Sequence, residues 1–330
     1  MGGDHAPASV LGGIKLSIDR GYVSPEQVVL TGPADRLRGE LAAHGLGDVS
    51  IEIQDAPDVL DGDESPVDAL RRKPRNSIAV GTELVKRGVA DALVSAGSTG
   101  LVVVCASMAL KRLEGIRKPG IAVTIEGESG PFTIVDVGAN PQPKPLHLLH
   151  YGLMGAAYHH DAFGTENPRV GLMNIGSEDG KGSPLAKEAA ELLRRADLNF
   201  VGNIEGVEMF TGKCDVIVAD GFTGNVLLKV SEGVAEHMLR SIARLMNEAE
   251  VTEPKQKHIL GSLQRRVDYS EYGGALLLGV DGIVTICHGR SGAAAIASAV
   301  RFALKAVGAH LNQHIVAATK RAEAADGGAA

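Results

Sequence analysis

The spacing of apolar residues along the chain predicts short strands that alternate with amphipathic helices. Short runs rich in Val and Ile are typical of strands buried in a sheet, and they are Val28–Thr31, Val49–Gln54, Ala92–Ala96, Ile121–Ile125, Thr133–Val137, Arg169–Ile175, Phe200–Ile204, Asp215–Ala219 and Gly282–Cys287. Apolar residues at helical spacing predict helices over Ala34–Ala43, Ile78–Lys86, Leu101–Arg112, Leu146–His159, Pro184–Arg195, Asn225–Asn247 and Ala293–Ala306. This alternation indicates a largely parallel sheet with helices on both faces.

Three segments refine this arrangement. The residues 126–131 between two predicted strands read as a hairpin turn, so the sheet is expected to be mixed. The polar stretch Asp61–Arg75 carries two prolines and is expected to be a loop, and the Ala/Gly-rich residues 322–330 are expected to be disordered. We therefore expect one catalytic α/β domain over residues 1–321, with a helical hairpin inserted at about 238–272.

The composition argues against several classes of protein. The formal net charge of −7 argues against a broad nucleic-acid surface, which needs dense Lys and Arg. The three cysteines, Cys105, Cys214 and Cys287, suggest a reducing compartment. The apolar stretch Leu276–Ile286 is broken by an aspartate and glycines, and no segment reaches the roughly 20 apolar residues of a membrane span. The first residues show no charged-then-apolar pattern, so we do not expect a secreted protein. We expect a cytoplasmic protein with at most peripheral membrane contact.

Several predicted strands end in a glycine-rich turn, and these turns are Ser95–Gly100, Asp136–Asn140, Asn174–Gly176, Asp220–Asn225 and His288–Gly292. In an open α/β sheet the ligand site lies at the carboxyl ends of the strands. Glycine there allows close approach of the backbone, and helix N-termini there favour anions. A single turn of this kind is most simply a tight connection, whereas the whole set predicts an anion site.

The common catalytic and cofactor motifs are absent. Gly180-Lys181-Gly182-Ser183 resembles the end of a P-loop, but position 175 is Ile and Gly182 follows the lysine. The sequence contains no dinucleotide-type glycine motif, no nucleophile elbow and no zinc-ligand spacing. None of the cysteines has a base suitably placed in the sequence. We expect no cofactor, no metal and direct attack of one bound substrate on another.

The glycine turns belong to a longer pattern that resembles the PlsX family of phosphate acyltransferases. The matching segments run in family order, and they are Met1–Pro7, Ser95–Gly100, Asp136–Asn140, Pro168–Leu172, Gly202–Gly206, Asp220–Asn225 and Asp268–Gly274. Asp220–Asn225 and Asp268–Gly274 are the most specific. Family members usually have a short strand before the first loop, whereas this sequence starts at Met1, and Ser98 replaces a usual Asn.

The resemblance implies a fold, a reaction and partners. The implied fold is a three-layer α/β/α sandwich related to isocitrate dehydrogenase-like and phosphotransacetylase folds, in a homodimer. The implied reaction converts a long-chain acyl-[acyl-carrier-protein] and inorganic phosphate into acyl phosphate and free carrier protein, for phospholipid synthesis. A membrane glycerol-3-phosphate acyltransferase would then use the acyl phosphate.

Lys181 and Asn225 are the side chains expected to act on phosphate and on the developing oxyanion. Lys181 precedes a predicted helix, where a positive charge opposes the helix dipole unless an anion is bound. Asn225 lies just inside another helix start, where its amide is placed to donate. A solvated lysine and a structural turn asparagine are the competing interpretations. The other expected substrate- or phosphate-binding residues are Gly3, Asp4, His5, Gly97, Ser98, Thr99, Asn140, Asp220, Thr223, Gly224, His288 and Ser291.

The segment Pro254–Tyr269 is basic in an acidic protein and carries an apolar stripe at helical spacing. It predicts a projecting hairpin that meets the acidic carrier protein, an anionic membrane, or both. The residues expected to dock are Lys255, Lys257, Leu260, Leu263, Arg265 and Arg266. Packing of the stripe against a partner subunit is the competing interpretation.

For the whole chain, two alternatives stay open: a phosphotransacetylase-like enzyme using acyl-CoA, and an inactive membrane-associated scaffold.

Overall fold

The computed structural model describes residues 2–60, 65–267 and 269–327, and the side chains of 265–267, 269, 270, 326 and 327 lie outside this description. The α-helices are α1 (Ala8–Asp19), α2 (Ala34–Ala43), α3 (Pro66–Arg72), α4 (Ser77–Lys86), α5 (Thr99–Ala109), α6 (Pro145–Phe163), α7 (Pro184–Arg195), α8 (Gly221–Glu248), α9 (Glu253–Val267), α10 (Ala293–Gly308) and α11 (Leu311–Gly327). Short 3₁₀ helices cover Pro25–Gln27, Gly206–Glu208 and Tyr269–Tyr272.

A mixed sheet of eight strands forms the middle layer, in the order β3-β10-β9-β4-β5-β8-β6-β7. These strands are β3 (Ala92–Ser95), β4 (Gly120–Gly127), β5 (Gly130–Val135), β6 (Arg169–Met173), β7 (Asn199–Ile204), β8 (Val216–Val218), β9 (Ala275–Leu278) and β10 (Ile283–Ile286). A second, two-stranded parallel sheet pairs β1 (Val29–Gly32) with β2 (Glu52–Asp55). A cavity of about 400 Å³ lies between β1, β3 and α1.

The strands of the large sheet run in two opposite directions. β5, β8, β6 and β7 pair in parallel with one another. β4 runs antiparallel to both β5 and β9, and β9 runs antiparallel to β10, which is parallel to β3. The carboxyl ends of β3 and β10 therefore lie at the opposite edge of the sheet from those of β5, β8 and β6.

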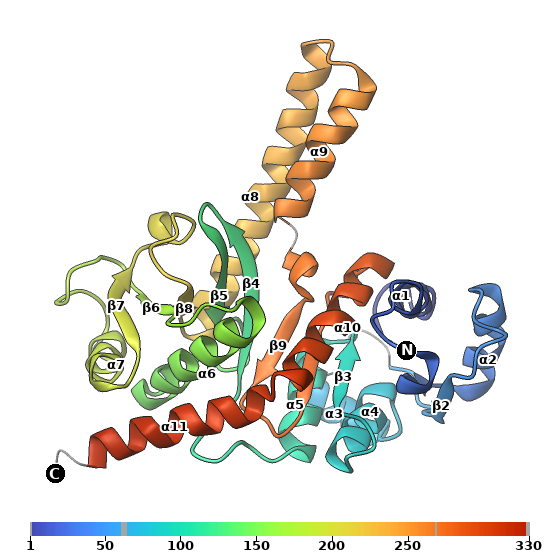
Figure 1. The fold of residues 1–330 in the computed structure, drawn as a ribbon, viewed down its shortest axis with the longest axis horizontal. Helices are drawn as coiled ribbons and strands as arrows, with labels where there is room; N and C mark the ends of the chain where they lie inside the picture. The colour runs from blue at the N-terminus through green and yellow to red at the C-terminus, as the bar shows by residue number, and fades with distance from the viewer. Residues whose placement is uncertain (1, 61–64, 268, 328–330) are drawn as a thin grey trace.

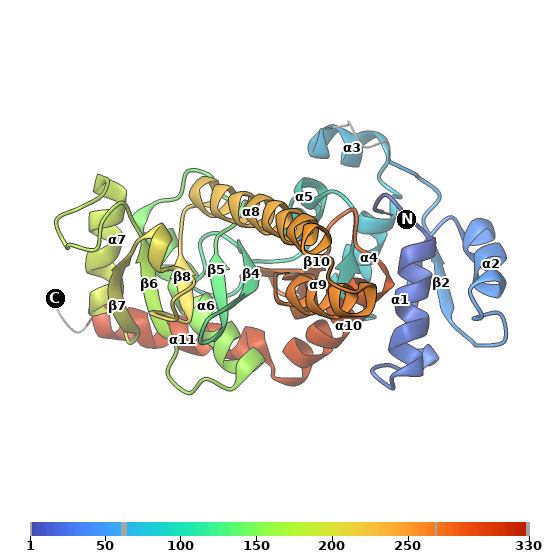
Figure 2. The same ribbon diagram turned by 90° about the horizontal axis from the view of Figure 1, so that it is seen from above.

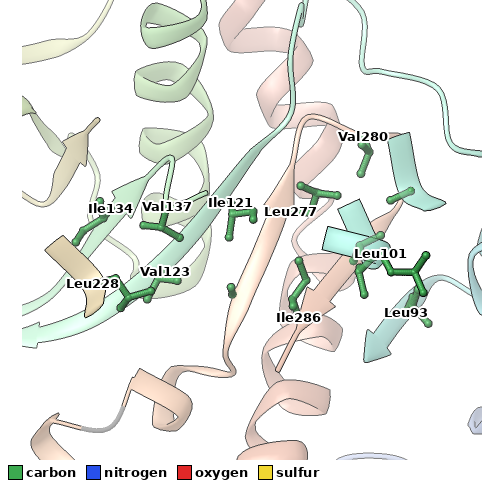
Figure 3. Close-up of a cluster of buried hydrophobic side chains, with 14 of the residues drawn as sticks. Leu93, Leu101, Ile121, Val123, Ile134, Val137, Leu228, Leu277, Val280 and Ile286 are labelled. Carbon is green, nitrogen blue, oxygen red and sulfur yellow. The ribbon is translucent and has the colours of Figure 1, made fainter. Parts of the chain in front are cut away.

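Helices cover both faces of the sheet and give it two hydrophobic cores. Along β4, Ile121 and Val123 join the core that lies under α5 and α8, whereas Ala122 joins the core under α6, α10 and α11. Figure 2 shows these helices on the two sides of the sheet, and Figure 3 shows Leu101 of α5 and Leu228 of α8 in the first core. The arrangement confirms the predicted three-layer α/β/α sandwich.

Helices α8 and α9 form the projecting hairpin (Figure 1). Gln256 ties its two arms together near the tip, because its Nε2 donates to Asn247 Oδ1 at 2.9 Å and to the carbonyl of Val251 at 2.8 Å. The predicted helical hairpin is thus present, although α8 begins well before it, at Gly221, on the sheet itself.

Two local predictions are wrong. The expected loop Asp61–Arg75 contains helix α3, because Ser65 caps it by accepting from the N–H of Asp68 and Pro66 occupies its first turn, where proline is tolerated. The expected disordered tail is helical as far as Gly327 within the described residues, and Ala322 is buried. In the described part of the chain, no single helix is long and apolar enough to cross a membrane; the bent pair α10 and α11 meets the criterion only by length and composition.

Candidate active site

One edge of the sheet gathers the loops that follow β5, β8 and β6. β8 lies between β5 and β6 and is parallel to both, so the three loops leave the sheet side by side. These loops carry Asn140, the segment Asp220–Asn225, and Lys181. The structure therefore brings both expected catalytic residues to the same edge, which we call the β5–β8–β6 edge.

Asp136 organises the first of these loops. The side chain is fully buried, and its Oδ1 accepts from the backbone N–H groups of Ile121, Gly138 and Ala139 at 2.9, 3.0 and 2.9 Å. Its Oδ2 accepts from the N–H of Asn140 at 2.7 Å. Burial raises the pKa of the Asp136 carboxyl, while the four N–H donors oppose that rise. The carboxylate thus fixes the backbone that carries Asn140.

The start of α8 packs directly on this loop. The N–H of Gly221 donates to the carbonyl of Asn140 at 3.0 Å, and a side chain at Gly224 would overlap the carbonyl oxygen of Asp136. Asp220 caps the helix, with Oδ1 accepting from two N–H groups, and its Oδ2 accepts from Thr223 Oγ1 at 2.6 Å. Asp220 and Thr223, both expected to bind phosphate, are therefore engaged in the cap.

Asn225 lies one turn after the start of α8 with an exposed side chain. Its amide makes no hydrogen bond to any residue that the structure describes. The placement just inside the helix start agrees with the sequence analysis. Asn225 therefore presents a free amide beside a helix N-terminus, where anions are favoured.

Lys181 lies in the loop between β6 and α7, held by its backbone rather than its side chain. Its N–H donates to the carbonyl of Glu178 at 3.1 Å, and its carbonyl accepts from Asn174 Nδ2 at 3.2 Å. Asn203, buried on β7, also donates to Glu178 at 3.0 Å and leaves its Oδ1 without a hydrogen-bond partner. Lys181 is exposed and forms no ion pair with a described residue. The loop thus holds a positive charge at the site edge.

His147 is a site residue that the sequence analysis missed. Asn140 Nδ2 lies 3.2 Å from Tyr151 Oη and 3.4 Å from His147 Nδ1, which also accepts from the N–H of Lys144 at 3.0 Å. Burial and the charges of Lys118 and Lys144 lower the pKa of His147. Because Nδ1 accepts from a backbone N–H, the neutral form of the ring carries its proton on Nε2. The position of His147 in the first turn of a helix, next to the Asn140 loop, was the available signal.

The remaining expected phosphate ligands lie at the opposite edge. The N–H of Asp4 donates to the carbonyl of Gly289 at 2.8 Å, which places the first loop on the turn after β10. Gly3, with φ of +96°, packs against Ala96 at the end of β3. The whole group comprises Gly3, Asp4, His5, Gly97, Ser98, Thr99, His288 and Ser291. Antiparallel pairing reverses β3 and β10 relative to β5, so these residues follow strand ends opposite to those that carry Lys181 and Asn225; one common anion site stays a prediction.

A cleft of about 660 Å³ accompanies this second group, between α8 and the start of α10. Ser291 is 7% exposed and Arg290 is exposed, but three glutamates, Glu232, Glu236 and Glu271, also line the cleft. Glu236 Oε1 lies 3.9 Å from Arg290. Lys229 also lines the cleft and pairs with Glu232 at 2.9 Å, so the cleft carries charges of both signs.

The expected docking residues lie on the hairpin. Lys255 is exposed, and Lys257 pairs with Glu253 at 2.6 Å. Leu260 and Leu263 are half-buried. The side chains of Arg265 and Arg266, and residue Asp268 of the family motif, lie outside the described residues.

Burial leaves all three cysteines poorly suited to nucleophilic catalysis. It raises the pKa of the Cys105 thiol to about 11 and those of Cys214 and Cys287 to about 12. The thiolate forms are therefore scarce near neutral pH. The expected lack of a covalent acyl-enzyme stays a prediction.

Comparisons with known proteins agree with this fold. A phosphate acyltransferase from Desulforamulus reducens is 41% identical over 309 residues, covering 93% of this chain and 92% of the relative. A phosphate acyltransferase from Nitratidesulfovibrio vulgaris is 43% identical over 325 residues, covering 96% and 92%. A solved phosphotransacetylase from Streptococcus pyogenes superposes with a TM-score of 0.63 at 20% identity, covering 91% of both chains, which shows a shared fold.

The family model described as fatty acid synthesis protein matches residues 1–314. This match spans the described strands and the three loops of the candidate site. Together with relatives above 40% identity over more than nine-tenths of the sequence, it decides the assignment. The chain belongs to the fatty acid synthesis protein family, the PlsX family of acyltransferases.

Proposed function

We propose that this enzyme transfers a long-chain acyl group from an acyl-[acyl-carrier-protein] thioester to inorganic phosphate, for phospholipid synthesis. The observation that carries the proposal is the convergence of Lys181, Asn225 and the start of α8 at one sheet edge, in a chain whose relatives are named phosphate acyltransferase. A cation, an amide donor and a helix N-terminus are suited to a phosphate dianion.

The reaction needs little more than positioning. One phosphate oxygen attacks the carbonyl carbon of the thioester, the C–S bond breaks, and its electron pair leaves with sulfur as thiolate. Lys181 would hold phosphate and offset its charge, and the Asn225 amide would donate to the oxygen of the tetrahedral intermediate. Lys181 precedes α7, where its charge opposes the helix dipole. A bound anion removes that conflict.

The exposed apolar side chains of α8 support two further parts of the proposal. Phe222, Val226, Val230 and Val234 follow one another at intervals of four residues and are 67, 43, 58 and 55% exposed, so a second copy of the chain would cover them in a homodimer. Farther out, the hairpin exposes Met238, Leu245 and Ile259. That end suits peripheral contact with a membrane, where a membrane acyltransferase would consume the acyl phosphate.

The proposal is tested by incubating the purified protein with acyl carrier protein thioester and ³²P-labelled phosphate. Formation of labelled acyl phosphate, with release of free carrier thiol, is expected. Turnover of acyl-CoA at the same rate, with no preference for the carrier protein, would favour a phosphotransacetylase-like enzyme. Absence of product from both thioesters would leave only the scaffold alternative.

Replacing Leu245 by Glu is expected to reduce binding to vesicles of anionic lipid by about tenfold, because a charge replaces apolar area at the membrane surface. Leu245 is 61% exposed. Vesicle co-sedimentation measures the effect. Val89→Glu is the matched control, since Val89 is 51% exposed and lies away from the hairpin, before β3. Equal sedimentation of both variants would exclude the hairpin as the membrane contact.

A further inference from the structure

A cluster of cations lies at the β5–β8–β6 edge, apart from the hairpin. Arg112, Arg117 and Lys118 belong to the loop between α5 and β4, and Lys144 immediately precedes α6. Because β4 is antiparallel to β5, its first residues lie at the same edge as the loop after β5. Figure 1 shows the loop between α5 and β4 at the bottom of the view and the hairpin at the top. We call these four residues the basic face.

Contacts with α6 hold the basic face together. The N–H of Arg117 donates to His150 Nδ1 at 3.3 Å, and Arg112 Nη1 donates to the carbonyl of Arg117 at 2.8 Å. The positive charges of Lys118 and Lys144 help to lower the pKa of His147, which lies one turn before His150. Arg117, Lys118 and Lys144 therefore lie around the start of α6, whose N-terminus adds a partial positive charge, and Arg112 is joined to them through Arg117.

The charges of the basic face are not neutralised by acidic neighbours. All four side chains are exposed, and within the described part of the chain none of them forms an ion pair with a carboxylate. Elsewhere on the surface, cations such as Lys15 and Lys213 pair with acidic neighbours at 2.8 Å. The acid in the same loop, Glu114, pairs with Lys320 at 2.7 Å. A local positive field thus persists in a chain of net charge −7.

Short contacts join the basic face to the candidate active site. His147 lies 3.4 Å from Asn140 Nδ2, and the carbonyl of Asn140 accepts from the N–H of Gly221 at the start of α8, one turn before Asn225. The cations near the hairpin tip, Lys255 and Lys257, are much farther away. Lys257 lies near Asn247 at the outer end of α8, and a rise of about 1.5 Å per residue puts that end roughly 33 Å from Asn225.

We propose that the basic face is the docking surface for the acidic acyl carrier protein. This inference rests on the proposed function, which requires a carrier that delivers its thioester to Asn225. A carrier bound at the basic face lies beside the site, whereas one bound at the hairpin tip would have to span the length of α8. Opposite charges also speed the encounter and suppress wrong orientations, in a salt-dependent way.

The test compares two variants with the same change in charge. Arg117→Glu with Lys118→Glu reverses the basic face, and Lys255→Glu with Lys257→Glu reverses the hairpin. The affinity of each for holo-carrier protein is measured by titration at low and high salt, and steady-state kinetics are measured with acyl-carrier thioester. We expect the basic-face variant to raise Kd and KM by at least about tenfold, to lose most of the salt dependence and to change kcat little. The hairpin variant should change Kd by less than about twofold.

The outcomes separate this inference from the proposed function. Wild-type affinity in the basic-face variant, or a loss confined to the hairpin variant, overturns the docking surface even if acyl phosphate is formed. Loss of anionic-vesicle binding in the basic-face variant with unchanged carrier affinity also overturns it. If the wild type binds the carrier through the basic face but forms no acyl phosphate, the proposed function fails while the docking surface stands. Unchanged thermal unfolding of both variants confirms that they fold.

Discussion

Replacing Lys181 by alanine is expected to lower kcat for acyl phosphate formation by about 10²–10³, the usual effect of losing one positioned donor to developing charge. The ammonium is exposed and unpaired among described residues, whereas the loop backbone is held by Asn174 and Asn203. The fold should therefore survive the substitution. Kinetics with carrier thioester and labelled phosphate measure the effect, and thermal unfolding checks the fold.

Asn225→Ala should lower kcat by a similar factor, about 10²–10³, because the amide makes no structural hydrogen bond to a described residue. Lys187→Ala provides the control: Lys187 is exposed on α7, six residues beyond Lys181, and should leave turnover unchanged. Near-normal phosphorolysis by either site variant would remove that residue from the mechanism, and a loss in the control would point to a general effect of surface charge.

The sequence predicts individual elements well where local signals agree. Helix α7 is predicted at its observed bounds, because Ser183 caps it, Pro184 begins it and arginines lie in its last turn. Helix α3 was missed because Pro66 was taken for a breaker, although it occupies the first turn. Strand β9 was missed because it lies in an apolar stretch interrupted by glycines.

The arrangement of the site depends on long-range pairing, which local pattern does not encode. The glycine turns after β3 and β10 look like those after β5 and β8, yet β9 reverses the direction of β10. Three successive antiparallel pairings thus place the turn with His288 and Ser291 after a strand that runs opposite to β5 and β8. Asp136 accepts from backbone N–H groups of β4 and of the Asn140 loop, and His147 accepts from the N–H of Lys144, immediately before α6. Only the fold makes those partners visible.

Gly224→Ala is expected to disturb both stability and catalysis, because a methyl group there overlaps the carbonyl oxygen of Asp136. The obstacle is backbone, held by a buried carboxylate with four N–H donors, so the start of α8 must move instead. We expect a loss of about 3 kcal/mol in the free energy of unfolding, at the upper end of overpacking. Displacement of Asn225 by about 1 Å should lower kcat about 10²-fold.

Gly233→Ala in the same helix is the matched control, since an added methyl group there meets no atom within 4 Å. Alanine is a better helix former than glycine. The free energy of unfolding of this variant should therefore rise by about 1 kcal/mol, and its activity should be unchanged. Denaturant unfolding and steady-state kinetics on both variants measure the contrast. If Gly224→Ala is as stable and active as Gly233→Ala, the contact between α8 and the Asp136 loop does not set the position of Asn225.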